Sequence, residues 1–233
     1  SAADLDHDGL PDFCAGTGIE GPGIGYVRAV RGQNGSIAWT RYESTVSSDH
    51  FGQALELVGD VDGDGLSDVL IGAPQASGNC GKAYLISSQD QSDIFVINGA
   101  CSAPDDRFGS SVGRLGDVSG DGLPDFTIAA SSADPCCGHY VGTIQAFGGA
   151  TAQPIWQASG TQGYDYAIQK LGKDINADGI LEVVWSSSQH GFSPVGPGYI
   201  RIHDGASGNV LHKIDGVHLD DHFGAQCALI DDV

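Results

Sequence analysis

The stretch DVDGDGLSD, residues 60–68, places four aspartates within nine positions. Carboxylates that alternate through a tight turn converge on one point, and their repulsion raises their pKa values unless a cation lies between them. Gly65 follows the third aspartate, where a glycine permits the sharp bend that brings the two ends of the turn together. The stretch therefore predicts a loop that binds a hard cation with oxygen ligands.

Similar stretches occur three more times along the chain. They read DLDHDGLPD from Asp4, DVSGDGLPD from Asp117 and DINADGILE from Asp174, and successive copies begin 56 or 57 residues apart. So regular a spacing indicates a protein of four repeats, with an incomplete fifth loop at Asp232.

Each repeat also carries strand-like runs in a constant order. An FG-headed run such as FGQALELVGD (51–60) precedes the acidic loop, and VLIGAP (69–74), GKAYLIS (81–87) and DIFVING (93–99) follow it. Short runs rich in β-branched residues and bounded by Gly and Pro are typical of strands. Four strands per unit of about 57 residues predict an all-β fold, a β-propeller of four-stranded blades.

Taken together, the FG pairs, the IGAP run and the aspartate loops resemble the FG-GAP repeats of integrin α-subunit β-propellers. The resemblance covers essentially the whole chain and implies that residues 1–233 form one β-propeller or part of one. It also implies that the first strand of each repeat lines the propeller axis, that the acidic loop joins the first strand to the second, and that each loop holds a calcium ion.

The four loops offer the same kinds of oxygen ligand. Side chains at alternate positions would contribute carboxylate, amide or hydroxyl oxygens, and the seventh residue its backbone carbonyl. The candidate ligands are Asp4, Asp6, Asp8, Leu10 and Asp12; Asp60, Asp62, Asp64, Leu66 and Asp68; Asp117, Ser119, Asp121, Leu123 and Asp125; and Asp174, Asn176, Asp178, Ile180 and Glu182. Affinity tends to follow the number of charged ligands, so we expect the first two loops to bind calcium more tightly than the third and fourth.

Other interpretations of the loops are weaker. An EF-hand or dockerin loop begins in the same way, but its twelfth residue is acidic and helices flank it. The twelfth residue here is Ala15, Ile71, Ile128 or Trp185, and strand-like runs flank each loop. A solvated turn capped by its own aspartate hydrogen bonds is the alternative that needs no cation.

Charge and hydropathy exclude two classes of partner. The chain carries 30 acidic and 10 basic residues, a formal net charge of −20. That charge repels the phosphates of nucleic acid, so we expect no nucleic-acid binding. No window approaches eighteen consecutive apolar residues, so we expect no insertion into a membrane.

The six cysteines suit disulfides in an oxidising compartment, and we expect an extracellular or cell-surface protein. Four of them fall in connections that the blade arrangement places opposite the acidic loops, where a bridge could link neighbouring blades; these are Cys80, Cys101, Cys136 and Cys137. Their pairing stays open. Cys14 and Cys227 would lie in one blade but out of register by roughly 10 Å, too far for a direct bridge.

Several other residues have a structural and a functional interpretation. The FG phenylalanines, Phe51, Phe108 and Phe223, are most simply core residues between blades. The residues before them, His50, Arg107 and His222, recur with the repeat, which favours a structural role over acid–base chemistry. The sequence Asn34-Gly35-Ser36 is either a glycosylation site or an unmodified hairpin turn.

The two ends of the chain match one another. The run FGAQCALIDD (223–232) lacks a hairpin partner, and the loop from Asp4 lacks a preceding strand. One end could complete the other, within one chain to close a small propeller or between chains to build an oligomer or filament. Alternatively, the chain is part of a longer, seven-bladed propeller.

These features favour a secreted, non-catalytic, calcium-binding propeller in adhesion, surface structure or assembly, whose protein or glycan partner the sequence does not identify. The alternative is an extracellular enzyme that degrades polysaccharide or phospholipid, since similar propellers occur in such enzymes. Its candidate residues are His139 and His190, in stretches that break the repeat symmetry. Neither stretch combines a nucleophile, a base and oxyanion donors, so we predict no catalytic residue.

Overall fold

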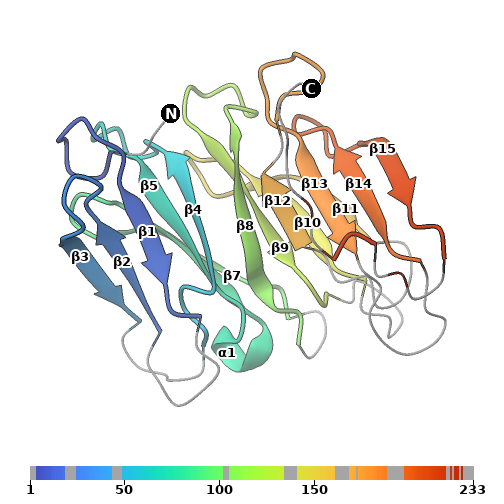
Figure 1. Ribbon diagram of the computed structural model, residues 1–233, viewed down its shortest axis with the longest axis horizontal. Helices are drawn as coiled ribbons and strands as arrows, with labels where there is room; N and C mark the ends of the chain where they lie inside the picture. Colours follow the sequence, from blue (N-terminus) through green and yellow to red (C-terminus); the bar gives the residue numbers. More distant parts are fainter. Residues whose placement is uncertain are drawn as a thin grey trace.

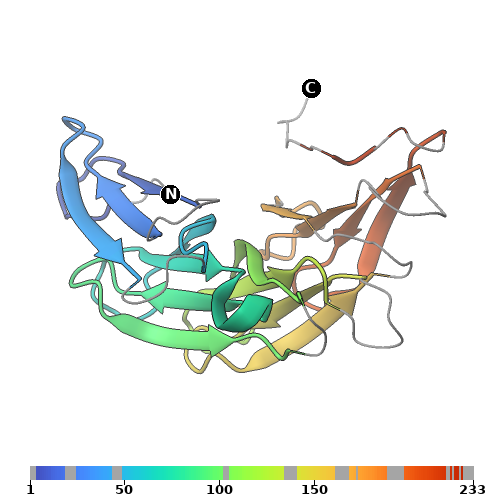
Figure 2. The same ribbon diagram turned by 90° about the horizontal axis from the view of Figure 1, so that it is seen from below.

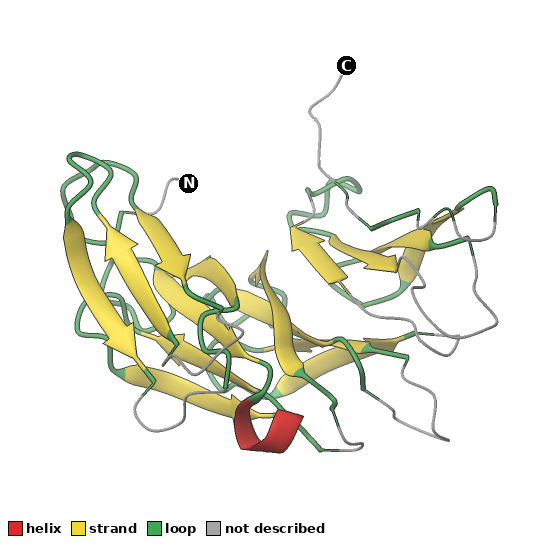
Figure 3. Cartoon of the chain, turned by 60° about the horizontal axis from the view of Figure 1, so that its bottom comes forward, coloured by secondary structure: helices red, strands yellow, loops and turns green. Residues whose placement is uncertain are grey.

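The protein is built from antiparallel β-strands (Figures 1 and 3). A computed structural model describes residues 4–18, 25–43, 49–101, 105–133, 141–160, 168–171, 173–187, 197–218, 221, 223–225 and 227. In these ranges the only helical element is one turn, α1 (Ala76–Asn79), whose residues Ser77 and Gly78 have left-handed backbone angles. The predicted all-β class is confirmed, and α1 is a tight connection that the strand pattern did not predict.

The strands form four separate sheets. The first contains β1 (Phe13–Gly16), β2 (Tyr26–Val30) and β3 (Ile37–Tyr42). The second contains β4 (Ala54–Gly59), β5 (Asp68–Ala73), β6 (Lys82–Ile86) and β7 (Asp93–Asn98). The third contains β8 (Phe108–Gly116), β9 (Asp125–Ala130), β10 (Thr143–Phe147) and β11 (Pro154–Ser159). The fourth contains β12 (Ile168–Leu171), β13 (Val183–Ser187), β14 (Tyr199–His203) and β15 (Val210–Asp215).

Each sheet is an up-and-down meander in which neighbours in sequence pair antiparallel, as in β4-β5-β6-β7. The first strands of the four-stranded sheets lie side by side, β4 against β8 and β8 against β12. The sheets follow one another around an open arc (Figure 2). This is the arrangement of blades in a β-propeller, as the sequence predicts. The acidic loops join the first strand of a blade to the second, as at β4–β5 and β8–β9.

The core lies between neighbouring sheets. On β5, Val69 and Ile71 face a cluster shared with the first sheet, and Leu70 faces a cluster shared with the third. All six residues of β5 are buried, because successive side chains point to opposite faces and both faces of the sheet are covered. This explains why VLIGAP reads as a continuous apolar run and not as an alternating one.

The FG pair joins one blade to the next. Phe108 forms an isolated parallel bridge with Gly81 of the preceding blade, and Phe223 does the same with Gly198. A Cβ atom on Gly72 would lie 2.0 Å from the backbone oxygen of Gly109, so the two backbones approach too closely for side chains. The predicted core position is confirmed for the first two phenylalanines but not for Phe223, which is 37% exposed because the described residues contain no blade beyond it.

One disulfide, Cys80–Cys101, forms among the described cysteines. It ties the β5–β6 connection to the segment that leads from β7 into the third blade, so it supports the join between two blades. Cys14 and Cys227 are free, as the register argument expects, and burial raises the pKa of Cys14 to about 12. Cys136 and Cys137 lie outside the described residues.

The predicted exchange of strands between the chain ends concerns the run 223–232, most of which lies outside the described part of the chain, and it stays a prediction. The sequence Asn34-Gly35-Ser36 lies in the exposed turn between β2 and β3, where the Asn34 side chain accepts a hydrogen bond from the Ser36 backbone N–H at 2.8 Å. The turn is therefore present, and glycosylation of it stays a prediction.

Candidate metal centres

The four acidic loops share one pattern of internal hydrogen bonds. In the second loop, Asp60 accepts the backbone N–H of Gly65 at 2.9 Å, and Asp64 accepts that of Leu66 at 2.7 Å. Asp68, the last acidic residue, accepts the backbone N–H of Val61 at 2.8 Å. The equivalent bonds to the last residue in the other loops run from Leu5 to Asp12, from Val118 to Asp125 and from Ile175 to Glu182.

These bonds orient the carboxylates before any cation binds. Gly65 has a φ of +90°, which confirms the predicted left-handed bend. The backbone N–H of Gly9 lowers the pKa of Asp4 in the first loop, so this carboxylate stays ionised. The capped turn that the sequence offered as an alternative is thus present, and it also shapes a possible ligand cage.

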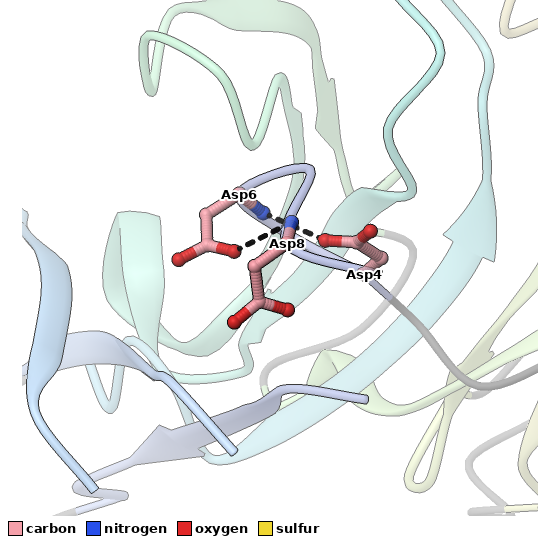
Figure 4. A group of neighbouring side chains, drawn as sticks. All are labelled: Asp4, Asp6 and Asp8. Carbon is pink, nitrogen blue, oxygen red and sulfur yellow. Dashed lines mark hydrogen bonds between the residues drawn. The ribbon is translucent and has the colours of Figure 1, made fainter. Parts of the chain in front are cut away.

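In three loops the acidic side chains converge. Ligand oxygens lie within 4.8 Å of one another in each of the sets Asp4, Asp6, Asp8; Asp60, Asp62, Asp68; and Asp174, Asp178, Glu182. Figure 4 shows the first set, with the carboxylates of Asp6 and Asp8 on the same side of the turn. The third loop forms no such set among the described residues, because Ser119 replaces a carboxylate and its hydroxyl donates to Asp125 at 3.3 Å.

The last acidic residue of each loop is buried, and in the second and fourth loops its two oxygens are not equally satisfied. Asp68 and Glu182 are 0% and 1% exposed, and one oxygen of each, Oδ1 and Oε1, accepts no hydrogen bond from the described residues. Burial, with the neighbouring negative charges of Asp62 and Asp64, raises the pKa of Asp68 to about 7. A buried carboxylate oxygen without a donor is costly unless a proton, a water molecule or a cation satisfies it.

The donor sets fit calcium in the second and fourth loops. The converging groups are all oxygens, which suits a hard cation and not zinc or copper. The unpartnered oxygens of Asp68 and Glu182 belong to these two sets. The ligand roles of individual residues, including the carbonyls of Leu10, Leu66, Leu123 and Ile180, stay predictions.

Some predicted ligands also have protein partners. Asp12 accepts a hydrogen bond at each of its two oxygens, from Leu5 and from Gly32. The Asn176 amide donates to Asp178 at 3.0 Å, which brings these two predicted ligands together.

The sequence did not point to one charged residue beside the first loop. Arg31, in the turn after β2, forms an ion pair with Asp6 and places a positive charge in the first loop. Aligning the repeats would have revealed it, because Arg31 is the only basic residue directly after the third strand of a repeat; these strands are β2, β6, β10 and β14.

Of the residues considered for acid–base chemistry, two lie in backbone turns and the others fall outside the described residues. His50 and Arg107 both have left-handed backbone angles, with φ of 55° and 56°, directly before the FG pair. Their recurrence in one conformation agrees with a turn-forming role. His139, His190 and His222 lie outside the described residues, so the enzymatic alternative stays a prediction.

No helix in the described ranges is long and apolar enough to cross a membrane.

Comparison with known proteins agrees with this architecture. The family model of the FG-GAP repeat matches residues 51–86, which span β4, the second acidic loop, β5 and β6. Integrin alpha-PS2 of Drosophila melanogaster is 30% identical over 187 residues, 75% of this chain and 13% of that protein. The chain spans 7% to 14% of the length of the curated integrin α relatives it matches.

Two solved structures share the fold. The Dos1 propeller has a TM-score of 0.51 at 13% identity, covering 84% of this chain and 43% of that one. The Bacillus licheniformis rhamnogalacturonan lyase PL11 has a TM-score of 0.50 at 14% identity, covering 93% of this chain and 50% of that one. With the family match and the blade arrangement, they lead to one conclusion: the chain is an integrin-like β-propeller that carries an FG-GAP repeat.

Proposed function

We propose that this chain is an extracellular, non-catalytic β-propeller that binds calcium and serves adhesion, surface structure or assembly. The observation that carries the calcium part is the buried, unpartnered Oδ1 of Asp68 in a loop where Asp60 and Asp62 converge on the same residue. The similarity to integrin α chains supports the adhesive part.

Calcium would supply the positive charge that three converging carboxylates lack. Asp60 and Asp62 follow β4, and Asp68 begins β5, so ligands from both sides of the loop would hold the first two strands of the blade together. In the fourth blade, Asp174 and Asp178 precede β13, and Glu182 lies directly before its first residue. Asp68 and Glu182 are buried, so they would anchor the ion to the sheet while the less buried aspartates close over it.

Two further features support an extracellular location. The Cys80–Cys101 bridge requires an oxidising compartment in most organisms. Millimolar extracellular calcium also suits exposed loops of modest affinity. The net charge of −20 favours partners with basic surfaces, or partners bound through the cations themselves.

A thermal melt in calcium and in chelator tests the calcium part. At a calcium concentration 100 times the Kd, binding adds about 2.7 kcal/mol, which for a chain of this size raises Tm by roughly 5–10 °C. Asp68→Asn should lose most of this rise. Asp215→Asn, an exposed aspartate on β15, is the matched control and should keep it. Equal melts with and without calcium would contradict the proposal.

The adhesive part needs a separate measurement. The chain, labelled and folded, should bind immobilised extracellular matrix proteins or glycans in calcium and lose that binding in chelator. Binding that is equally strong in chelator, or no binding to any matrix component, would contradict the adhesive role.

A further inference from the structure

The four repeats differ at two positions directly after their third strands. These positions are occupied by Arg31-Gly32, Ser87-Ser88, Gly148-Gly149 and Asp204-Gly205. The first residue of each pair donates the same turn hydrogen bond, from Arg31 to Ser36, from Ser87 to Ser92, from Gly148 to Gln153 and from Asp204 to Asn209. The positions are therefore structurally equivalent, and each pair lies against the acidic loop of its own blade.

A glycine at the second position lets the turn touch the acidic loop. A Cβ atom on Gly32 would lie 1.8 Å from the backbone oxygen of Pro11, and one on Gly149 would lie 2.2 Å from that of Pro124. In these two blades the glycine N–H reaches the last aspartate. Gly32 donates to Asp12 Oδ1 at 2.9 Å, and Gly149 donates to Asp125 Oδ1 at 2.7 Å.

The second blade has Ser88 in place of this glycine. Its Cβ atom excludes so close an approach, and among the described residues Asp68 Oδ1 receives no hydrogen bond. The Ser88 hydroxyl is also buried without a partner. The serine thus leaves one carboxylate oxygen of the second loop available. In the first and third loops the equivalent oxygen accepts a backbone N–H.

In the first blade, the first of the two turn positions is Arg31, which makes the first loop less available to a cation. The Arg31 side chain donates to Asp6 Oδ2, one of the three converging carboxylates. A guanidinium keeps its charge at every physiological pH, so Arg31 already neutralises part of this set. In the second loop the equivalent residue contributes only a neutral hydroxyl, which Ser87 donates to Asp64 at 3.3 Å.

We infer that these turn residues decide which of the two loops with four aspartates binds calcium more tightly. The second loop is the tightest site because Ser88 leaves Asp68 Oδ1 available and all four of its acidic positions are aspartates. The fourth loop also has an unpartnered oxygen, Glu182 Oε1, but Asn176 replaces one of its carboxylates. The first loop has the same number of aspartates but binds weakly, because calcium must displace Arg31. The inference rests on the proposed calcium function and replaces the expectation that the first two loops are equivalent.

Isothermal titration of the metal-free chain with calcium tests the inference. Wild type should show one tightest site, which Asp68→Asn removes. Arg31→Ser should add a second tight site, with an affinity for the first loop at least tenfold higher. Ser88→Gly should weaken the tightest site at least tenfold, since the backbone N–H can then reach Asp68. Lys213→Ser removes one positive charge, as Arg31→Ser does, but from the exposed strand β15. It should change neither the affinity of the first loop nor that of the tightest site.

The outcomes separate the two proposals. If no variant binds calcium, the proposed function fails. If wild type binds calcium but Arg31→Ser and Ser88→Gly leave every affinity unchanged, this inference fails and the calcium function stands. Arg31→Lys provides a second variant should Arg31→Ser fold poorly; it keeps the charge and should keep the first loop weak, and a tenfold gain in that variant would overturn the role of charge.

Discussion

Gly81 and Phe108 lie so close across the join between the second and third blades that a Cβ atom on Gly81 would be 2.1 Å from the Phe108 backbone oxygen. Gly81 also has a φ of +83°, which side chains rarely adopt. The close approach explains why a glycine heads the third strand and why an FG pair heads the next repeat.

Gly81→Ala should destabilise the fold by about 2–4 kcal/mol, because the new methyl group meets backbone and the left-handed angle is strained. Gly78→Ala is the matched control. Gly78 has a φ of +71° and nothing within 4 Å of the added Cβ, so only the strain of about 1 kcal/mol applies. Urea denaturation measures both. Equal losses in the two variants would show that the contact with Phe108 is unimportant.

Phe51 and Phe223 occupy the same place in their repeats but differ in burial. Phe51 is 1% exposed and packs edge-on against Tyr84, with ring centroids 5.2 Å apart, whereas Phe223 is 37% exposed. Phe51→Ala should cost about 3–5 kcal/mol and Phe223→Ala about 1 kcal/mol. Denaturant unfolding distinguishes them, and a Phe223→Ala loss as large as that of Phe51→Ala would mean that Phe223 is covered in solution.

The Cys80–Cys101 bridge closes a loop with a sequence separation of 21 residues. Replacing both cysteines by serine should lower the free energy of unfolding by about 3 kcal/mol, because the unfolded chain regains the freedom of that loop. Reducing agent should lower the stability of wild type by the same amount and leave the double variant unchanged. A double variant as stable as wild type would contradict the bridging role.

Glu56 gives the fold a pH dependence. Burial raises its pKa from 4.5 to about 7, although the positive charge of Arg114 on β8 acts in the other direction. Since the pKa is higher in the folded state, the contribution of Glu56 to stability is complete below pH 4.5 and is lost as the pH rises through 7.

Glu56→Gln should therefore be more stable than wild type above pH 7, by about 1–2 kcal/mol once screening by water is allowed for. Near pH 4.5 the two proteins should be equally stable. Urea unfolding in chelator at both pH values measures the difference. An advantage that is the same at both values would show that Glu56 does not titrate in this range.

Most of the fold could be predicted because its signals are local. The run VLIGAP became β5 (Asp68–Ala73), and GKAYLIS became β6 (Lys82–Ile86), because their short length and the glycine or proline at their ends favour strands over helices. The acidic loops were visible for the same reason. Their candidate ligands lie within nine residues, so spacing alone brings them together.

What could not be predicted depends on contacts between distant residues. Arg31 meets Asp6 across 25 positions, and Ser88 affects Asp68 across 20, so the composition of a loop did not reveal its neighbours. The disulfide is a similar case, because six cysteines allow fifteen pairings. Helix α1 was missed because its turn depends on left-handed angles at Ser77 and Gly78.

Anomalous diffraction from crystals grown in calcium would show whether the second loop holds a calcium ion. We predict a calcium peak in that loop within 2.3–2.6 Å of Asp68 Oδ1, with Asp60 and Asp62 as further ligands. A well-ordered second loop in which Asp68 Oδ1 binds only water, at millimolar calcium, would contradict it.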